Sequence, residues 1–376
     1  MSVFSLNNIY AAESEDLQMK ELTTRERILR TCRHQEIDRM AMVDYPWPGT
    51  LRRWHNEGLP LDVDWRDYFG FDNIVKLTPD NSPRIPKKVL EENDRYSIIT
   101  TPWGQTQRVF RELDSTPEVL DCYFDSAEKW QEAKEKMLTD DEDRIPWDLL
   151  KKNYPKWKAE GQYLRLGLWF GFDVTHSHMV GTENLLIGLY DDPEWIEDMF
   201  DTYLTVSLRL AQKIIDAGYE FDGIFWYDDM GYKGSPFFSS QLYRELLMPY
   251  HKRAVDWAHE RGMVAELHSC GFIEPLLPDI VETGVDILNP VEIKAGMDPF
   301  RLKKMYGDKL TFRGGINAQL WDNPELVRSE MERIIPMMLE GGGYIFASDH
   351  SIPNSVSLEQ MRMISDLAHK LGKQSK

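Results

Sequence analysis

The chain has few cysteines and no long apolar segment. Its 376 residues include three cysteines, Cys32, Cys122 and Cys270, whose spacing does not repeat, so the sequence carries no disulfide framework. No apolar run is long enough to cross a bilayer, and the opening "MSVFSLNNIYAAESEDLQ" lacks the basic start and sustained apolar stretch of a secretory signal. We therefore predict a cytoplasmic protein without membrane spans and with a polar tail over residues 1–22.

Positive charge is also scarce. The chain has 44 Lys and Arg against 63 Asp and Glu, its formal net charge is -19, and it contains no basic run. Such a chain repels a phosphate backbone, which argues against nucleic acid as a partner and leaves small molecules and other proteins. A glycine-rich phosphate fingerprint does not follow the first predicted strand, which argues against a dinucleotide-binding fold.

The second half of the chain alternates short β-like runs with longer helices, a rhythm typical of a parallel sheet. Strands are expected at "YLRLGLW", "FDGIFWY", "MVAELH", "VDIL", "LTFRGG" and "GYIFA", preceded by "RMAMVD" and "DNIVKLTP". Eight such strands predict an α/β fold, a (β/α)8 TIM barrel over residues 23–376. The segment 79–160, with its clusters of proline and charge, is expected to be an insertion or cap on this barrel.

In a barrel of this kind the chemistry sits at the C-terminal ends of the strands, where His268 and Cys270 stand in "HSCG". Residues two apart on a strand point to the same side, so an imidazole and a thiolate here would reach one ion, and zinc accepts both ligands. A hydrogen-bonded histidine beside a small buried cysteine explains the spacing equally well. The sequence leaves both interpretations open.

A catalytic zinc usually has three protein ligands. We favour His350, in "FASDHSIP", as the third, because the last barrel strand ends near the same opening. Asp349 is the neighbouring alternative. Glu266 shares the strand alternation with His268, and either binds the metal or orients the histidine.

Two adjacent acids, Asp228 and Asp229, follow another predicted strand in "WYDDMGYKG". In extended backbone they point apart, so we expect one of them to enter the site as a general acid or as an anchor for the substrate. The alternative is a turn with a capping aspartate.

Other strand ends carry groups suited to binding a small molecule. Arg313 either binds a carboxylate or phenolate of the ligand or pairs with Glu292. The chain is rich in large rings, with 12 Trp, 16 Tyr and 16 Phe, and such rings often line pockets for flat ligands. The side chains that we expect to face the substrate are Asp44, Trp169, Tyr227, Glu266 and Arg313.

Several segments resemble the uroporphyrinogen decarboxylase superfamily. They are "TTRERILRTCRHQEIDRMAM", "PFFSSQLYRELLMPYHKRAVDWAHERG", "HSCG", "DILNPVEIKAGMDPFRLKKMYG" and "GGGYIFASDHSIPNSVSLEQM". The resemblance extends over most of the chain from Thr23 and implies a (β/α)8 barrel with one of two chemistries. One branch decarboxylates uroporphyrinogen without a cofactor. The other comprises zinc methyltransferases that move a methyl group between a corrinoid protein and a thiol or methoxylated substrate.

The motifs differ between these branches. The decarboxylases carry an arginine-rich motif of the type R-Q-A-G-R near the first strand, whereas this chain has Arg52 and Arg53 in "MVDYPWPGTLRRWHNEGLP" without that motif. The methyltransferases carry H-x-C, which matches His268 and Cys270, and a later cysteine where this chain has His350. The decarboxylases also have a histidine at that later place, so His350 does not separate the branches.

The resemblance therefore favours a zinc-dependent methyltransferase that transfers a methyl group from a methoxylated or methylated small molecule. A corrinoid carried by a partner protein is implied, because no part of this chain looks like a cobalamin-binding domain. The alternatives are a metal-independent decarboxylase and a non-catalytic barrel that binds a tetrapyrrole or another flat ligand.

Overall fold

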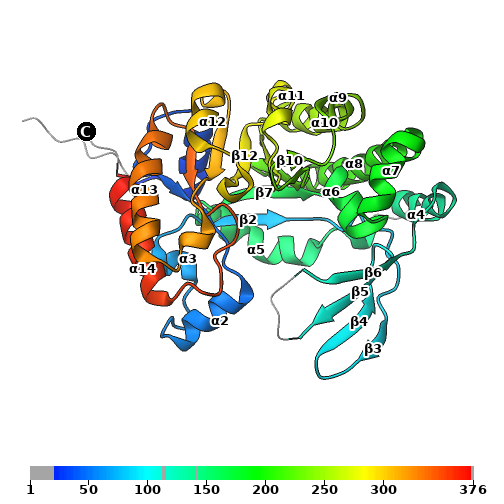
Figure 1. The fold of residues 1–376 in the computed structure, drawn as a ribbon, viewed down its shortest axis with the longest axis horizontal. Helices are drawn as coiled ribbons and strands as arrows, with labels where there is room; N and C mark the ends of the chain where they lie inside the picture. Colours follow the sequence, from blue (N-terminus) through cyan, green and yellow to red (C-terminus); the bar gives the residue numbers. More distant parts are fainter. Residues whose placement is uncertain (1–20, 112–115, 140–141, 374–376) are drawn as a thin grey trace, which may run out of the picture.

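Eight parallel strands form one curved sheet in the computed structural model, which describes residues 21–111, 116–139 and 142–373 (Figure 1). The predicted α/β barrel is confirmed. Seven of the eight predicted segments contain one of its strands, and the eighth, "VDIL", overlaps the first two residues of a strand that runs on to Val291. In their order around the sheet they are β1 (Ala41–Met42), β14 (Tyr344–Phe346), β13 (Thr311–Gly314), β12 (Ile287–Val291), β11 (Val264–His268), β8 (Gly223–Tyr227), β7 (Tyr163–Leu168) and β2 (Ile74–Leu77).

The outermost strands of this sheet, β1 and β2, are bridged by Asp72. Its backbone N–H donates to the carbonyl of Met42 (2.8 Å), and its carboxylate accepts from the Met42 N–H (2.9 Å). Arg27 and Arg39 pair with the same carboxylate, which satisfies the buried charge. These bonds bring the sheet edges together in the way a barrel requires.

Helices and loops surround the sheet, as Figure 1 shows. The helices are α1 (Thr24–Cys32), α2 (Pro48–Asn56), α3 (Trp65–Phe69), α4 (Ala127–Thr139), α5 (Trp147–Ala159), α6 (Phe172–Val174), α7 (Thr182–Asp191), α8 (Pro193–Asp216), α9 (Ser240–Leu242), α10 (Met248–His259), α11 (Leu277–Glu282), α12 (Pro299–Tyr306), α13 (Pro324–Leu339) and α14 (Leu358–Leu371). Among the described residues, none of these helices combines the length and the apolar character needed to span a membrane.

The N-terminal end of the barrel is packed with apolar side chains. Ile28 and Leu29 of α1 form one buried cluster with Ile74, Tyr163 and Ile287 from the lower parts of three strands. Because alternate residues of a strand share a face, Lys76, Arg165 and Asn289 point into the same lumen one layer higher. The apolar plug therefore leaves only the opposite end of the lumen open for chemistry.

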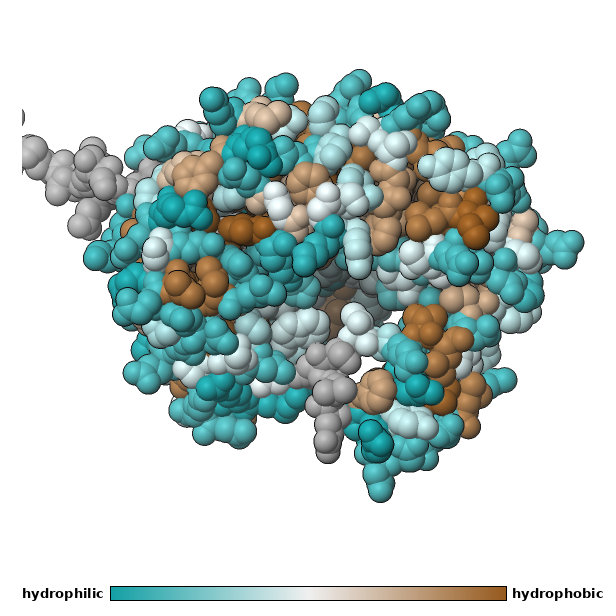
Figure 2. Space-filling model, viewed as in Figure 1, coloured by the Kyte–Doolittle hydropathy of each residue, from teal (hydrophilic) through white to brown (hydrophobic). Residues whose placement is uncertain are grey.

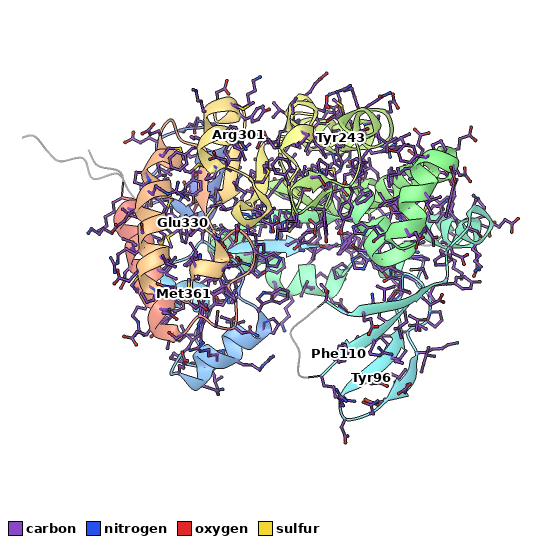
Figure 3. All side chains as sticks on the ribbon, viewed as in Figure 1. Tyr96, Phe110, Tyr243, Arg301, Glu330 and Met361 are labelled. Carbon is purple, nitrogen blue, oxygen red and sulfur yellow. The ribbon has the colours of Figure 1, made fainter. Side chains whose placement is uncertain are left out.

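Part of the predicted insertion at 79–160 forms a separate antiparallel sheet of β3 (Val89–Glu92), β4 (Tyr96–Thr100), β5 (Gln105–Phe110) and β6 (Glu118–Cys122). Its rings Tyr96 and Phe110 pack on each other, with centroids 6.2 Å apart (Figure 3). Figure 2 shows apolar side chains gathered over this region, where Val89 and Leu120 are exposed. A short hairpin of β9 (Gly231–Tyr232) and β10 (Ser235–Pro236) lies after β8. Of the predicted tail, residues 1–20 lie outside the described residues.

Candidate functional site at the open end of the barrel

Three side chains with ligating atoms meet at the C-terminal ends of β8 and β11. They are Asp229, His268 and Cys270, which we call the rim cluster, and their ligating atoms all lie within 4.8 Å of one another. The His268 Nε2 atom is 3.3 Å from the Cys270 Sγ and 3.7 Å from an Asp229 carboxylate oxygen. The predicted pair His268 and Cys270 thus lies together, and Asp229 joins it.

Two glycines allow the loops that carry this cluster to approach each other. The Cys270 N–H donates to the Asp229 carboxylate (2.8 Å), which ties the loop after β11 to the loop after β8. A Cβ at Gly271, whose φ is +85°, would come within 2.2 Å of the Gly231 backbone. A side chain there would push Asp229 and Cys270 apart, so glycine is required by the geometry of the cluster.

Asn289 fixes the tautomer of His268. Its Oδ1 accepts a hydrogen bond from Arg313, which can only donate, so the same oxygen accepts from His268 Nδ1 (2.6 Å). The Nε2 atom is then left unprotonated and faces Cys270 and Asp229. Burial, together with the nearby Arg313, lowers the pKa of His268 to about 4, which keeps the ring neutral. This is the state in which an imidazole binds a metal.

The geometry of the rim cluster suits zinc. Tetrahedral zinc with bonds of about 2.0–2.3 Å separates neighbouring N, O and S ligands by about 3.4–3.6 Å. Burial raises the pKa of Asp229 to about 7, with Asp173 adding to the effect, and raises the pKa of the Cys270 thiol well above its usual range. A divalent cation is the group that would let both of them ionise there.

The neighbouring Asp228 points away, as predicted for adjacent residues in extended backbone. It is fully buried, accepts from His251 Nε2 (2.6 Å) and from the Asp173 N–H (2.7 Å), and burial raises its pKa. The Tyr243 hydroxyl lies 2.9 Å from the other nitrogen of His251. Asp228 therefore anchors the loop after β7 and the helix α10, and Asp229 is the acid that reaches the opening.

Deeper in the lumen lie four charged side chains, Lys76, Arg165, Glu266 and Arg313, which we call the floor cluster. Glu266 is buried and pairs with Arg165 and, at 3.1 Å, with Arg313. Although burial opposes its charge, these two arginines lower its pKa, so it stays ionised. Of the two roles predicted for Arg313, pairing with Glu292 is replaced by pairing with Glu266, while Glu292 accepts from the Gly271 N–H (2.6 Å).

Rings form a wall between the two clusters and the insertion. Tyr227 lies edge-on to His268, with centroids 4.7 Å apart, and Trp169 lies 6.1 Å from Tyr227. Trp103, from the turn between β4 and β5, reaches over to Trp169 (6.4 Å) and His178 (6.4 Å). No sequence pattern pointed to Trp103 beyond its place in the insertion. Its ring brings the small sheet to the barrel opening.

The other predicted residues lie apart from the rim cluster. Asp44 is buried and bonds the N–H and hydroxyl of Ser348 (2.6 and 3.0 Å), which joins the ends of β1 and β14, and burial raises its pKa to about 7. His350 is exposed and stacks on Trp47 with centroids 5.9 Å apart. Asp349 accepts from the Ala318 N–H (2.7 Å). The structure does not bring His350 or Asp349 among the ligating atoms.

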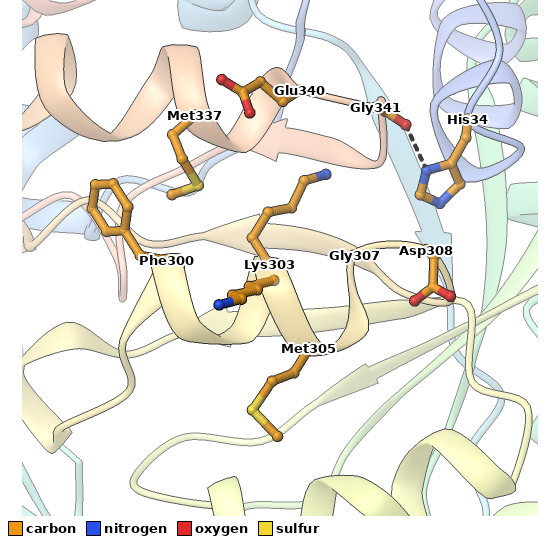
Figure 4. A pocket seen from close by; sticks show the side chains of 10 residues that line it. His34, Phe300, Lys303, Met305, Gly307, Asp308, Met337, Glu340 and Gly341 are labelled. Carbon is orange, nitrogen blue, oxygen red and sulfur yellow. Dashed lines mark hydrogen bonds between the residues drawn. The ribbon is translucent and has the colours of Figure 1, made fainter.

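Two surface hollows differ in their relation to the site. One of about 960 Å³ is lined by His34, Lys303 and Gly341 (Figure 4). It lies at the N-terminal ends of the strands, opposite the rim cluster. A smaller hollow of about 380 Å³ includes Cys270 and Lys294 in its wall. The rim cluster therefore borders the smaller hollow, through Cys270.

The family model of uroporphyrinogen decarboxylase (URO-D) matches residues 173–371, more than half of the chain and all of the rim cluster. The chain belongs to this family. It is 24% identical over 189 residues to the uroporphyrinogen decarboxylase of Pseudoalteromonas atlantica (strain T6c / ATCC BAA-1087). That match covers 49% of this chain and 51% of the relative, so the chain spans about half the length of the relative.

The fold of this URO-D family member is similar to that of a methyltransferase from Methanosarcina mazei. The TM-score is 0.60 at 16% sequence identity, and the match covers 93% of this chain and 99% of the other. At this level of identity the likeness concerns the fold.

Proposed function

We propose that this URO-D family member is a zinc-dependent methyltransferase that moves a methyl group between a methoxylated or methylated small molecule and a corrinoid protein or thiol. The observation that carries the proposal is the rim cluster, in which an imidazole, a thiol and a carboxylate converge at ligand spacing on the chemical end of a barrel. The departure from the decarboxylase arginine motif and the fold shared with a methyltransferase support it.

Three side chains would hold the zinc, namely His268 through Nε2, Cys270 through Sγ and Asp229 through one oxygen. When bound, zinc supplies Lewis-acid stabilisation of the charge that develops on the leaving oxygen or on a thiol. Asn289 holds His268 in the ligating tautomer, and the Cys270 N–H holds Asp229 in place. Three protein ligands leave the fourth position of a tetrahedral site for the substrate.

The wall of Trp103, Trp169 and Tyr227 positions the substrate and excludes water from the reacting bond. Asp228 does not act as the acid in this scheme, because both of its oxygens are already bonded to His251 and to the Asp173 N–H. A corrinoid partner would dock over the same opening and supply the methyl acceptor there.

Methyl transfer from a panel of methoxylated aromatic compounds to free cob(I)alamin tests the proposal directly. We expect zinc-loaded protein to form methylcobalamin, seen in the visible spectrum, and His268→Ala to form none. Cys122→Ser, a half-buried cysteine on β6 outside the rim cluster, is the matched control and keeps the activity. A wild-type protein that binds zinc but transfers no methyl group from any donor would contradict the proposal.

A second candidate, a metal-independent decarboxylase, is favoured by the cationic floor cluster. There Arg313 would hold the carboxylate that leaves, at a site that needs no zinc. Release of carbon dioxide by metal-stripped wild-type protein, unchanged in His268→Ala, would support this candidate against the methyltransferase. A barrel that only binds its ligand would give neither product.

A further inference from the structure

The floor cluster holds more positive than negative charge. Three of its members, Lys76, Arg165 and Arg313, are cations, and Glu266 is its one carboxylate. They come from β2, β7, β13 and β11, whose alternate residues face the lumen. Arg165 and Arg313 are buried and share the one carboxylate of Glu266, whereas Lys76 is exposed. A buried charge is costly unless it is paired, so a further anion in the lumen would offset the surplus.

Several hydrogen-bond donors of these cations have no partner. Three of these donors, among the described residues, are buried and have no hydrogen-bond partner: Nε and Nη1 of Arg313 and Nε of Arg165. Water does not satisfy them from outside, because each of these side chains is at most 4% exposed. Buried donors without acceptors are rare in proteins, and each is costly. An acceptor in the lumen would satisfy them.

Lys76 is the cation of the floor cluster that solvent reaches. Its ammonium lies 4.8 Å from the ring centroid of Tyr227 and 5.2 Å from that of Phe225, inside the barrel. It is nevertheless exposed, and no carboxylate of the described residues lies within ion-pair distance of it. Solvent therefore reaches the ammonium of Lys76, which has no anionic partner among the described residues.

The same residues lie next to the rim cluster. Arg313 and His268 bond the same oxygen of Asn289, and Tyr227 contacts both Lys76 and His268. A small molecule whose anionic end meets the floor cluster therefore has its other end at the ligating atoms. A methoxylated benzoate is a molecule with two such ends.

We propose that Lys76, Arg165 and Arg313 bind the carboxylate of the substrate, so that this protein acts on an acidic methoxylated compound in preference to a neutral one. This inference rests on the proposed function, from which the methoxy group of the substrate is taken. The binding site itself is testable without turnover and without zinc.

Titration calorimetry on the full chain tests it, with the three isomers of methoxybenzoate and the three matching methoxybenzamides as probes. Each amide keeps the ring and the methoxy group and loses the charge. The measurements are made on zinc-loaded and on metal-stripped protein. We expect at least one acid to bind about tenfold more tightly than its amide, since hydrogen bonds to charged groups are among the stronger ones.

Lys76→Met is the main variant, because it breaks no ion pair among the described residues and should fold. We expect it to weaken binding of the acid by about tenfold and to leave the amide unchanged. Lys252→Met, which removes an exposed lysine paired with Asp256 on α10, is the matched control and keeps wild-type affinity. Arg313→Met should also weaken binding of the acid, provided that thermal unfolding shows this variant to be folded.

The outcomes separate this inference from the proposed function. Preference for the acid in both metal states, lost in Lys76→Met, supports the floor site even if no methyl transfer is found. Failure of all three acids to bind, equal affinity for acid and amide, or an unchanged Lys76→Met would overturn it even if zinc and methyl transfer are established.

Discussion

The rim and the floor of the lumen are only two residues apart along β11, where Glu266 belongs to one and His268 to the other. At the rim, the imidazole is neutral, and burial opposes ionisation of the Cys270 thiol and of Asp229, so under the proposed function these groups bind a cation. At the floor, the groups carry fixed charges with the cations in excess. One barrel strand thus supplies a side chain to a neutral cluster of ligating groups and a side chain to a charged cluster, in successive inward-facing layers.

The largest effect is expected from removing the one carboxylate of the floor cluster. Glu266→Gln leaves two buried arginines without their counter-charge, and the loss of one partner of a buried pair costs about 3–5 kcal/mol of unfolding free energy. Chemical denaturation measures this. Glu220→Gln, an exposed glutamate, should cost less than about 0.5 kcal/mol. A stable Glu266→Gln variant would mean that the floor is not held by its ion pairs.

Substitution of Asp228 should lower the stability of the protein, whereas substitution of the adjacent Asp229 should weaken metal binding. Asp228→Asn places an amide where His251 and the Asp173 N–H donate, and an unsatisfied buried donor costs about 1–3 kcal/mol. Asp229→Asn should leave the unfolding free energy near that of the wild type, because its oxygen still accepts from the Cys270 N–H. Asp229→Asn should nevertheless lose most of the wild-type affinity for zinc. The reverse pattern in denaturation and zinc titration would exchange the roles given to the two residues.

Asn289→Ala tests whether Asn289 holds His268 in the tautomer and orientation needed to bind a metal. Without the acceptor at Nδ1, the ligating tautomer of His268 is no longer selected, and loss of such a partner weakens metal binding by about tenfold to a hundredfold. Competition with a zinc chelator gives the affinity. An affinity equal to that of the wild type would show that His268 does not depend on Asn289.

Trp103→Ala tests whether the insertion contributes to the site. The ring contacts Trp169 and His178, and aromatic pairs contribute about 0.5–1.5 kcal/mol beyond their buried area. We expect severalfold weaker binding of the methoxybenzoate probe and unchanged zinc binding. Tyr96→Ala, on the same small sheet but away from the barrel, is the control. Equal effects of the two variants would point to a general change in the small sheet.

The smallest effect concerns pH. Although the Lys76 side chain is exposed, its ammonium lies against Phe225 and Tyr227, and the partial loss of water there, with Arg165 beside it, lowers its pKa to about 8. A bound carboxylate would raise this pKa. The complex then takes up a proton, so the affinity for the acid should fall as the pH rises above about 8. The groups facing Lys76 are Arg165, Glu266, Arg313 and Tyr227, and Lys76→Met should lack this slope. A slope retained in Lys76→Met would assign it to another of these groups.

Much of the fold could be predicted because the strand and helix patterns of the second half are regular. Seven barrel strands lie within the predicted segments, and β12 begins in its segment and extends three residues beyond it. The pair His268 and Cys270 was visible because both lie on one strand end. The place of Asp229 beside this pair was not visible, since it depends on two loops that meet at Gly231 and Gly271. Sequence placed Asp229 only among the candidate acids.

Other site residues escaped for reasons of register and packing. Lys76 and Arg165 each stand in an otherwise apolar strand, and only the closed sheet shows that they face inward. His350 follows β14 as expected, but Ser348 bonds both Asp44 and the His350 carbonyl (2.6 Å), and the imidazole then lies against Trp47. A ligand role for His350 stays a prediction, and His350 is not part of the rim cluster.

The zinc content of the purified protein, measured by elemental analysis after equilibration with zinc, tests the central claim most directly. We predict about one zinc per chain in the wild type, in Cys122→Ser and in His350→Ala, and almost none in His268→Ala and Cys270→Ser. A wild type that binds no zinc, or variants of His268 and Cys270 that keep it, would contradict the claim that the rim of this barrel is a metal site.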